Sequence, residues 1–341
     1  MICKVGIIGC GKIAQTRHIP EYLRNKRSLI TGVYDINFER ATAVASEIGC
    51  VAYKNVEEML ESAEIDAVSV CSINKFHAQH TIQALEHGKH VLCEKPMGCT
   101  LQECEDMISA AKKAGKRLMI GHNQRLAEAH VLAKKMIADG RIGDVLHFRT
   151  TFGHGGPETW SVDSGNGNWF FDKNRSAMGV IADLGIHKID LIQYLTGQNI
   201  VNASAILATL DKKFSDGKPI DVEDNAIITC SLSGGAIGTI HMSWTFYGLE
   251  DNSTVLYGSK GIMKIFENKD SPLTVIDKDG KAEYFNTESI QTNDKQTNTG
   301  IIDEFINSIL DNRMSRIECT DILPAMKVAF SCVESSNQTN I

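Results

Sequence analysis

Residues 4–14, with the sequence KVGIIGCGKIA, decide the fold of the N-terminal half of the chain. Their apolar residues predict a short buried strand, the glycines predict a tight turn, and the residues after the turn predict a helix. Backbone N–H groups and the helix dipole attract a pyrophosphate at such a turn. Gly9 permits the sharp turn, Gly11 lets a phosphate approach without meeting a Cβ atom, and Ala14 lets helix and strand pack closely. This stretch therefore predicts a dinucleotide-binding turn.

An acidic residue stands at the distance that such a turn requires. A second apolar segment, residues 29–34, ends in Asp35. A carboxylate there accepts hydrogen bonds from a ribose 2′-OH and repels a 2′-phosphate, which favours NAD over NADP. The alternative is an ordinary glycine turn with a surface aspartate, but the order of strand, glycine turn, helix and acidic strand end favours the nucleotide site.

Length and composition describe an ordinary globular protein. The chain has 341 residues, 43% of them hydrophobic, and a formal net charge of −7. Without a basic block, neither nucleic acid nor an anionic membrane is an expected partner. No apolar run approaches the length of a membrane span, and the first residues enter a strand directly, without room for a signal peptide. These features favour a cytoplasmic protein.

The cysteines and histidines do not form recognisable ligand sets. None of the ten cysteines forms a C-x-x-C pair, and several lie in apolar strand-like runs. In a chain of cytosolic character we expect them to be reduced rather than linked in a disulfide framework. His122, His147 and His154 are scattered without ligand spacing, so no metal site is expected.

The first part of the chain alternates between two hydrophobic patterns. Strands are predicted at residues 4–8, 29–34, 50–53, 66–72, 90–93 and 118–121, with amphipathic helices at 38–48, 78–87 and 101–114 between them. Strict alternation of this kind predicts a parallel sheet with helices on both faces. We therefore expect an N-terminal Rossmann domain over residues 1–123, with its ligands at the carboxyl ends of the strands.

The pattern changes after residue 123. A helix is predicted at 126–139, strands with period-two alternation at 146–152 and 240–246, and hairpin turns at 258–261 and 277–280. One helix near 183–195 interrupts the strands, a loop covers 286–300, and two helices near 299–312 and 321–335 end the chain. The fold class is thus α/β, with a C-terminal α+β domain over residues 124–341 that carries an open-faced, mostly antiparallel sheet.

Polar residues follow the fourth predicted strand. Ser72, Asn74 and His77 would lie at the cofactor crevice, because the carboxyl ends of parallel strands meet there. Asn74 is also a good helix N-cap, and a lone histidine such as His77 is more often structural than functional.

Two opposite charges, Glu94 and Lys95, follow the fifth predicted strand and precede a proline. A lysine at the carboxyl end of a strand points into the crevice. Near a nicotinamide it would hold a substrate hydroxyl and favour the alkoxide as hydride leaves. Alternatively, the two residues form a surface salt bridge of little energetic value.

Asp183 and His187 are four residues apart in the predicted helix near 183–195, so they share one face. A carboxylate beside an imidazole can transfer a proton, because a histidine titrates near neutral pH and a neighbouring aspartate orients it. The alternative is a capped helix with a partly buried histidine, and the spacing alone does not decide between the two.

Four runs together resemble the Gfo/Idh/MocA family of nicotinamide-dependent oxidoreductases. They are GCGKIA at 9–14, HAQHTIQALEHGKHVLCEKP at 77–96, GHNQR at 121–125 and ADLGIHKIDLIQYL at 182–195, and the resemblance covers essentially the whole chain. It implies a Rossmann domain followed by an open-faced α/β domain whose sheet commonly forms the oligomer interface. A homodimer or homotetramer through that sheet is therefore expected.

The resemblance also assigns roles. His187 would accept the proton of the substrate hydroxyl, Asp183 would assist and Lys95 would position the substrate. The expected NAD contacts are Gly9, Gly11, Lys12, Ile13, Asp35, Ser72, Asn74, His77, Glu94, Lys95, Asn123 and Trp169. The expected substrate contacts are Lys95, Arg125, Trp169, Asp172, Asp183 and His187.

These roles imply an NAD-dependent oxidoreductase that interconverts a secondary alcohol and a ketone on a sugar, a sugar derivative or a cyclitol. Two alternatives from the same family are a redox-neutral NAD-dependent glycosidase and a non-catalytic NAD-binding regulator. Retention of Lys95, Asp183 and His187 argues against the regulator, which need not keep a proton-transfer set.

One departure from the family pattern concerns the substrate side. Family members usually carry two or three glycines before the helix of Asp183, where this chain has Ala177, Met178 and Gly179. A close backbone approach to substrate would be hindered at Met178, whereas the NAD site would not be affected.

Overall fold

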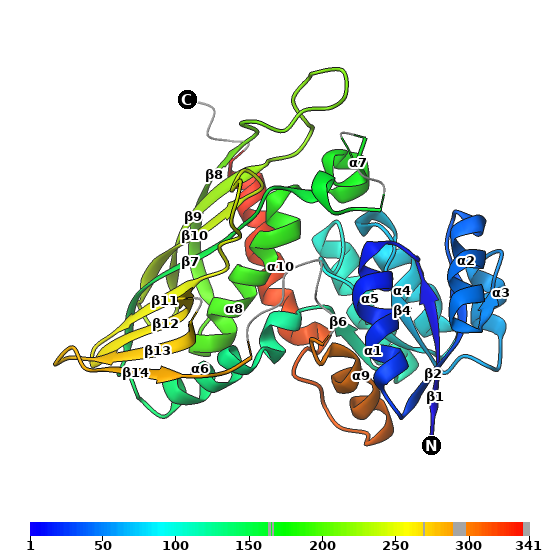
Figure 1. The fold of residues 1–341 in the computed structure, drawn as a ribbon, viewed down its shortest axis with the longest axis horizontal. Coiled ribbons are helices and arrows are strands. Elements are labelled where there is room, and N and C mark those ends of the chain that lie inside the picture. The colour runs from blue at the N-terminus through cyan, green and yellow to red at the C-terminus, as the bar shows by residue number, and fades with distance from the viewer. Residues whose placement is uncertain (163–164, 166, 269, 289–297, 337–341) are drawn as a thin grey trace.

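A computed structural model describes the chain except for residues 163–164, 166, 269, 289–297 and 337–341. The N-terminal domain lies at one end of the molecule and a large curved sheet lies at the other, with helices between them (Figure 1). The C-terminal helix crosses this middle layer, so the two domains share their packing.

The N-terminal sheet has the six strands that the sequence predicts. They are β1 (Cys3–Ile8), β2 (Ser28–Tyr34), β3 (Val51–Ala52), β4 (Ala67–Val70), β5 (His90–Cys93) and β6 (Leu118–Ile120), in the order β3-β2-β1-β4-β5-β6. Every neighbouring pair is parallel. The strand order reverses between β1 and β4, and such a switch point is where an open α/β sheet binds its ligand.

The connections of this domain are helical. They are η1 (Ala14–His18), α1 (Ile19–Arg24), α2 (Phe38–Ile48), α3 (Val56–Glu61), η2 (Asn74–Phe76), α4 (His77–Glu86) and α5 (Leu101–Ala114). Local sequence fixes several starts, since Asn37 caps α2 and Thr100 forms a capping box with Glu103 at α5. The short helix α3, capped by Asn55, was not among the predicted elements.

The second sheet has eight strands. They are β7 (Val145–Gly153), β8 (Ile200–Ala208), β9 (Asn225–Leu232), β10 (Ile237–Ser243), β11 (Thr254–Gly258), β12 (Gly261–Asn268), β13 (Ser271–Asp277) and β14 (Ala282–Phe285), in the order β14-β13-β12-β11-β7-β10-β9-β8. All pairs are antiparallel except β7 with β10. The mostly antiparallel sheet and both hairpins are therefore confirmed.

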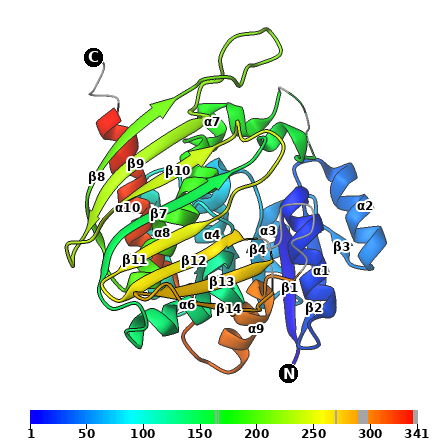
Figure 2. The same ribbon diagram turned by 60° about the vertical axis from the view of Figure 1, so that its left-hand side comes forward.

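Helices cover one face of this sheet and leave the other open (Figure 2). The helical elements of this part are η3 (Asn123–Leu126), α6 (Glu128–Ala138), η4 (Pro157–Thr159), η5 (Trp169–Phe171), α7 (Lys173–Ser176), η6 (Ile181–Gly185), α8 (Ile186–Thr196), α9 (Ile301–Leu310) and α10 (Cys319–Ser336). Along β9, Ile228 and Cys230 are buried against the helices, whereas Ile227 is exposed on the open face. The alternation gives each strand one face for the core and one for solvent.

The end of the chain returns to the N-terminal domain. Helix α9 packs Ile302 and Phe305 into the same core as Val5 and Ile7 of β1. The backbone N–H of Ile120 in β6 then donates to the carbonyl of Ile317, at 3.1 Å. The predicted division, which assigns all of residues 124–341 to the C-terminal domain, does not anticipate that part of this segment packs on the N-terminal domain.

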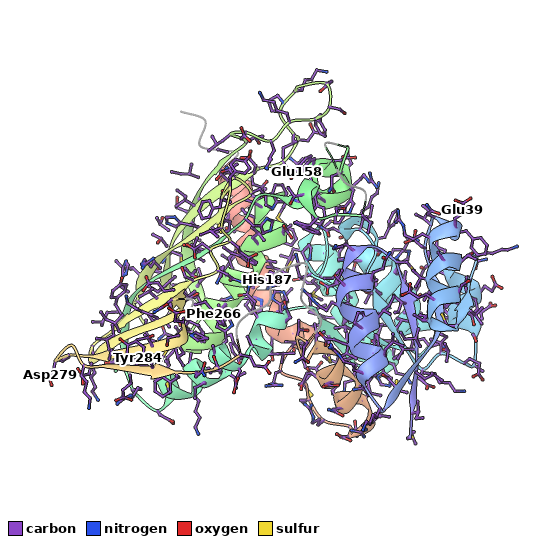
Figure 3. The ribbon with its side chains drawn as sticks, in the orientation of Figure 1. Glu39, Glu158, His187, Phe266, Asp279 and Tyr284 are labelled. Carbon is purple, nitrogen blue, oxygen red and sulfur yellow. The ribbon has the colours of Figure 1, made fainter. Side chains whose placement is uncertain are left out.

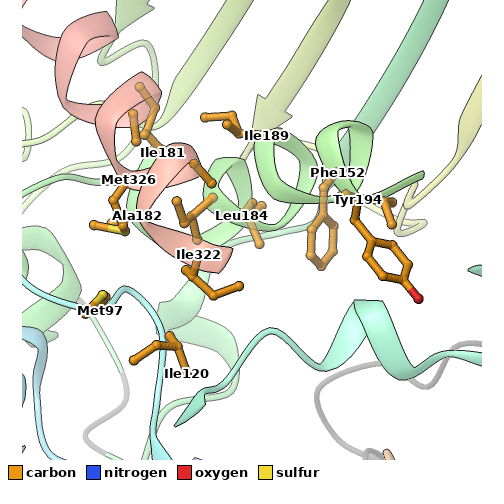
Figure 4. Packing of buried hydrophobic residues seen from close by; sticks show 14 of the residues in the cluster. Met97, Ile120, Phe152, Ile181, Ala182, Leu184, Ile189, Tyr194, Ile322 and Met326 are labelled. Atoms are coloured by element: carbon orange, nitrogen blue, oxygen red, sulfur yellow. The ribbon is translucent and has the colours of Figure 1, made fainter. Parts of the chain in front are cut away.

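A second core runs through the junction of the domains (Figure 4). Ile120 and Met97 from the N-terminal domain belong to the same buried cluster as Ile322 and Met326 of α10 and Leu184 of η6. Because this core is continuous, it fixes the end of β5 relative to the start of α8. None of the helices in the described ranges combines the length and apolarity that a membrane crossing requires.

Candidate active site

A cavity of about 650 Å³ opens at the carboxyl ends of β1, β4 and β5 and extends to the start of α8. Both domains line it, and His187 lies between them (Figure 3). Its position at the switch point of the sheet is the one that the fold predicts for a ligand.

The glycine turn after β1 leaves room for a ligand. Gly9 has a φ of +96°, and a Cβ atom there would lie 2.6 Å from the carbonyl oxygen of Cys71, so only glycine fits. At Gly11, by contrast, a Cβ atom would meet nothing within 4 Å. The open space lies at the start of the helix that continues through η1 and α1, where backbone N–H groups favour a phosphate.

The Asp35 carboxylate is fixed at the end of β2. It is buried, and its two oxygens accept the backbone N–H groups of Cys10 and Asn37, each at 2.8 Å. Arg40 lies 3.7 Å from the same carboxylate. An anchored carboxylate that still borders the cavity suits recognition of a ribose hydroxyl.

The residues after β4 connect the two halves of the cavity. The ring nitrogens of His77 lie 2.7 Å from the Pro96 carbonyl and 2.9 Å from the Ser72 carbonyl. The Asn74 side chain donates to the Ser176 carbonyl at 2.9 Å, which joins the domains. His77 and Asn74 thus have structural partners and also line the cavity, as does Ser72.

Glu94 and Lys95 have separate partners, so the alternative of a surface salt bridge between them is wrong. Glu94 is buried and accepts hydrogen bonds from His18 at 2.9 Å and Arg17 at 3.2 Å. Burial opposes ionisation, but the His18 hydrogen bond and the Arg17 charge prevail and lower the pKa of Glu94 to about 2. Lys95 reaches the other domain instead.

The Lys95 ammonium joins the domains at the inner end of the cavity. It donates to Asp183 Oδ1 at 2.8 Å and to the Asp183 carbonyl at 2.9 Å. The indole N–H of Trp244 donates to Asp183 Oδ2 at 3.0 Å. Burial opposes ionisation, but the charges of Lys95 and His154 and the donated hydrogen bonds lower the pKa of Asp183.

His187 is buried beside this pair. Its pKa is lowered well below the usual value by burial and by the charges of Lys95 and Arg17, so the imidazole is neutral at pH 7. Its Nδ1 atom is buried and has no hydrogen-bond partner in the described part of the chain. A neutral imidazole on the cavity wall is able to accept a proton.

The structure differs from the expected direct pairing of Asp183 with His187. Within the described residues, the Asp183 carboxylate bonds to Lys95 and Trp244, while the His187 ring packs near Phe152 and His122. The reason is local, because the π-helical turn η6 begins this helix. The Asp183 carboxylate is therefore bonded to Lys95 and Trp244 in this structure, and the described residues show no bond from it to the His187 ring.

Every residue predicted to contact the cofactor lines the cavity, and so do four of the six predicted substrate contacts. Arg125 and Asp172 are the exceptions. Arg125 is buried and grips Asp190 through two hydrogen bonds of 2.6 and 2.8 Å. Asp172 caps α7 by accepting the Asn174 N–H at 2.8 Å.

Several lining or supporting residues escaped the sequence argument. They include Arg17, His122, Phe152, Trp160, Phe170, Trp244 and Asn252. Phe152 and Trp244 had a signal, since the alternation along residues 146–152 and 240–246 places each of them on one face of a strand. The others come from segments whose side-chain direction depends on tertiary packing.

The glycine-poor segment before α8 has an unexpected geometry. Met178 points into the core and does not line the cavity. Ala177 instead adopts a φ of +69°, and Gly179 packs so tightly that a Cβ atom would lie 2.0 Å from the Glu223 carbonyl. The expected hindrance at Met178 therefore has no counterpart at the cavity wall.

Comparison with known proteins decides the family. Residues 3–122 match the oxidoreductase family with an NAD-binding Rossmann fold, and residues 130–264 match the GFO/IDH/MocA C-terminal domain. The chain belongs to the Gfo/Idh/MocA family of oxidoreductases. Its N-terminal domain is an NAD-binding Rossmann domain.

Members of this family that resemble the chain are named as sugar and cyclitol dehydrogenases. Glucose-6-phosphate 3-dehydrogenase of Bacillus subtilis is 32% identical over 66% of this chain and 63% of its own length. Myo-inositol 2-dehydrogenase of Thermotoga maritima is 29% identical over 80% of this chain and 77% of its own. A structure of levoglucosan dehydrogenase with NADH and levoglucosan has a TM-score of 0.86 at 23% identity, covering 99% of this chain and 98% of that one. The chain thus spans less than two thirds of the length of glucose-6-phosphate 3-dehydrogenase.

The residues of this Gfo/Idh/MocA protein fit an NAD molecule. The unfilled space at Gly11 suits the pyrophosphate, and Asp35 suits the adenosine ribose. In the described part of the chain, no three His, Cys, Asp or Glu side chains gather closely enough to hold a metal ion.

Proposed function

We propose that this protein is an NAD-dependent dehydrogenase that interconverts a secondary alcohol and a ketone on a sugar, a sugar derivative or a cyclitol. The observation that carries the proposal is the convergence of Lys95, Asp183 and His187 at the inner end of the nucleotide cavity. NAD, when bound, supplies the hydride acceptor. The protein must then orient the alcohol and remove its proton.

Lys95 and His187 divide these two tasks. The ammonium of Lys95, fixed by two contacts to Asp183, can donate a hydrogen bond to the substrate oxygen and stabilise the negative charge that develops on it. His187, held neutral by burial and by neighbouring cations, accepts the hydroxyl proton as a general base. Asp183 keeps Lys95 in place, and Trp244 fixes the Asp183 carboxylate.

The walls around these residues suit a polyol. Phe152, Trp160 and Phe170 offer apolar surface, and Gln124 and Asn252 offer amide groups. A pocket that combines aromatic faces with a few polar groups is able to bind the C–H faces and the hydroxyls of a sugar ring. The names of the relatives, which act on glucose 6-phosphate, myo-inositol and levoglucosan, support the same substrate class.

The test is the appearance of NADH absorbance when the protein and NAD meet a panel of sugars, sugar acids, amino sugars and inositols. His187→Ala is expected to lower kcat by at least about a hundredfold, the usual effect of losing a general base, and to leave NAD affinity unchanged. Equal turnover in the variant would refute the role of His187. Silence of the wild-type protein across the panel, with NAD bound, would favour the redox-neutral glycosidase or the regulator.

We also propose that the open face of the C-terminal sheet joins copies of the chain into a dimer or tetramer. Ile206, Ile227, Ile237 and Tyr284 expose apolar side chains on the strands of that sheet. Apolar side chains on an unpaired sheet face favour association. Sedimentation analysis of the wild type and of Ile227→Asp tests this assignment, and a wild-type monomer at micromolar concentration would refute it.

We also propose that the protein is cytoplasmic. All ten cysteines are free thiols, and eight of them are fully or nearly fully buried. Burial raises the pKa of Cys93, Cys104 and Cys319, which keeps those thiols protonated and unreactive. Such a set suits a reducing compartment.

A further inference from the structure

A second histidine, His122, lies behind His187. It follows β6, is 1% exposed and does not line the cavity. The centroids of the two imidazole rings are 5.7 Å apart, with the ring planes tilted by 60°. A direct N–H···N hydrogen bond between two imidazoles places their centroids about 5 Å apart, so a small rotation of either side chain would complete it.

Both rings have unused hydrogen-bonding atoms. Among the residues that the structure describes, His187 Nδ1 and both nitrogens of His122 are buried without a hydrogen-bond partner. An unsatisfied buried polar atom destabilises the folded state, so two adjacent imidazoles in this state are unfavourable for stability. A functional role explains the histidine at position 122 better than a structural one, because a hydrophobic residue there would remove the unsatisfied polar atoms.

The charges around the pair are distributed unevenly. Asp190 Oδ2 lies 3.2 Å from His122 Nδ1, in ion-pair range, although this contact lacks the angle of a hydrogen bond. Burial opposes ionisation of Asp190, but His122 and Arg125 lower its pKa to about 2, so it is an anion. His187 instead faces the positive charges of Lys95, Arg17 and Lys188. A carboxylate therefore borders His122 whereas cationic side chains border His187, and this arrangement favours positive charge on the His122 side of the pair.

We propose that His122 takes up, through His187, the proton that leaves the substrate hydroxyl, with Asp190 as the counter-charge. This inference rests on the proposed dehydrogenase function and extends it by one residue. His122 is a positioning residue in this scheme, because it acts through His187 and does not touch the substrate.

The transfer balances without a further reactant. The substrate O–H bond breaks as one nitrogen of His187 accepts the proton, and the opposite nitrogen of the same ring releases a proton to His122. His187 ends neutral and His122 ends as an imidazolium beside the Asp190 carboxylate, while NAD, when bound, would supply the acceptor for the hydride. When the product departs, the proton returns from His122 to His187, which lines the cavity, and leaves to the solvent that refills it.

Two substitutions at position 122 separate a proton acceptor from a structural support. His122→Phe keeps an aromatic ring and removes all proton binding, whereas His122→Asn keeps an N–H donor toward Asp190 but cannot accept the proton. Both are expected to lower kcat by about tenfold, the effect of losing a supporting partner, with KM and NAD affinity unchanged. Both should also raise the solvent deuterium isotope effect on kcat, because proton transfer becomes slower.

His130→Phe is the matched control. His130 is also a fully buried histidine, but its ring packs on Phe266 and its Nδ1 contacts the Gln124 carbonyl at 2.8 Å. This control should keep kcat and the isotope effect. Wild-type values in His122→Phe, or restored activity in His122→Asn alone, would refute the relay and leave the dehydrogenase function standing.

A measurement without turnover tests the contact if no substrate is found. The ring nitrogens of ¹⁵N-labelled histidines report the tautomer of His187, whose signals can be assigned by their loss in His187→Gln. With NAD bound, His122→Phe should shift the Nδ1 signal of His187 and leave that of His130 in place. Unchanged His187 signals would refute the coupling, whether or not the protein oxidises a sugar.

Discussion

At the scale of single residues, each ionised group that is buried at the cavity has an opposite charge nearby. Asp183 is paired with Lys95, Glu94 with Arg17, and Asp190 with Arg125. Removing one partner of such a pair leaves an uncompensated charge, which costs more than the pair itself contributes. Catalytic variants should therefore keep size and charge balance where possible, and each needs a stability measurement beside its activity.

Lys188 differs from these groups. It is fully buried and donates to the Asn252 carbonyl at 3.0 Å, with the Thr254 hydroxyl at 3.4 Å. Burial lowers the pKa of Lys188 to about 7, so its ammonium loses a proton far more readily than that of a surface lysine. Its contact with Asn252 supports one part of the cavity wall from behind.

Asp35→Ala should change the choice of cofactor. The Asp35 carboxylate would repel a 2′-phosphate, and Arg40 beside it would remain as a cation that can attract one. We expect the preference for NAD over NADP, measured as the ratio of kcat/KM values, to fall by at least about tenfold. Asp35→Glu, which keeps the charge, is the control. A wild-type protein that already prefers NADP would contradict this assignment.

At the scale of elements, substitutions in the turn between β1 and η1 can separate an effect on stability from an effect on NAD binding. Gly11→Ala adds a methyl group to space that no protein atom occupies, so the free energy of unfolding should change by less than about 0.5 kcal/mol. NAD affinity, measured by calorimetry, should fall by at least about tenfold, because the methyl group occupies the phosphate position.

Gly9→Ala serves as the contrast in the same turn. Its Cβ atom would collide with the backbone at Cys71, and its φ of +96° disfavours any other residue. This variant should lose stability as well as NAD affinity. Undiminished NAD binding in Gly11→Ala would mean that the pyrophosphate lies elsewhere.

The connection between α7 and η6 stores backbone strain at Ala177. Its φ of +69° with a ψ of −45° is unfavourable for any residue with a Cβ atom. Ala177→Gly should therefore raise the free energy of unfolding by about 1 kcal/mol. Ala43→Gly, at an exposed position within α2, is the matched control and should lower it by a similar amount. A loss of stability in Ala177→Gly, followed by urea denaturation, would contradict the strain.

The elements that could be predicted from the sequence are those with strong local signals. Parallel strands such as β4 are apolar throughout, and helices such as α5 carry a capping box and an amphipathic pattern, so both were located closely. Helix α3 is only six residues long, too short for a periodic pattern to emerge. The expected loop at 286–300 lies largely outside the described residues.

Side-chain direction was harder to predict than the position of an element. Arg125 follows β6 in the expected place, but the 3₁₀ turn η3 aims its guanidinium at Asp190 instead of the cavity. Trp244 reaches Asp183 from 61 residues away, and no spacing in the sequence signals this contact. Lys95 and His187 were correctly placed on the cavity wall because strand ends and helix faces do have predictable directions.

At the scale of the whole molecule, the two domains are one packed unit. Helix α10 contributes to the core that also contains Ile120 of β6, and α9 packs on β1. The Lys95–Asp183 contact crosses the same junction. The geometry of the active site therefore depends on global folding, and conditions that weaken the fold should also reduce activity.

Buried histidines make this global stability depend on pH. Burial lowers the pKa of His130 to about 3 and that of His80 and His90 to about 4, and it lowers the pKa of His187 well below the usual value. In the unfolded chain these groups titrate near pH 6.5, so below that pH the unfolded state binds more protons. Stability must fall as the pH decreases from about 6.5, by about 1.4 kcal/mol per pH unit for each such histidine.

Buried carboxyl groups affect stability differently over the same pH range. Burial raises the pKa of Glu250 to about 7, so this group stabilises the folded state as the pH falls and offsets about one histidine. Glu94 and Glu304, with pKa values of about 2, lose their contribution only below about pH 4.5, where unfolded carboxylates protonate. Between pH 6.5 and 4.5 the histidines therefore determine how steeply the free energy of unfolding falls with pH.

Urea denaturation at every half pH unit between pH 7.5 and 4.5 measures how the free energy of unfolding changes with pH. Steps of about half a unit are fine enough, because a single group titrates over about one pH unit. His130→Asn keeps a donor for the Gln124 carbonyl and removes one titrating group. The free energy of unfolding of this variant should fall less steeply with decreasing pH than that of the wild type, because its unfolding takes up about one proton fewer. A wild-type stability that is constant or rises from pH 6.5 to 4.5 would contradict the buried neutral histidines, including the neutral state that His187 needs to act as a base.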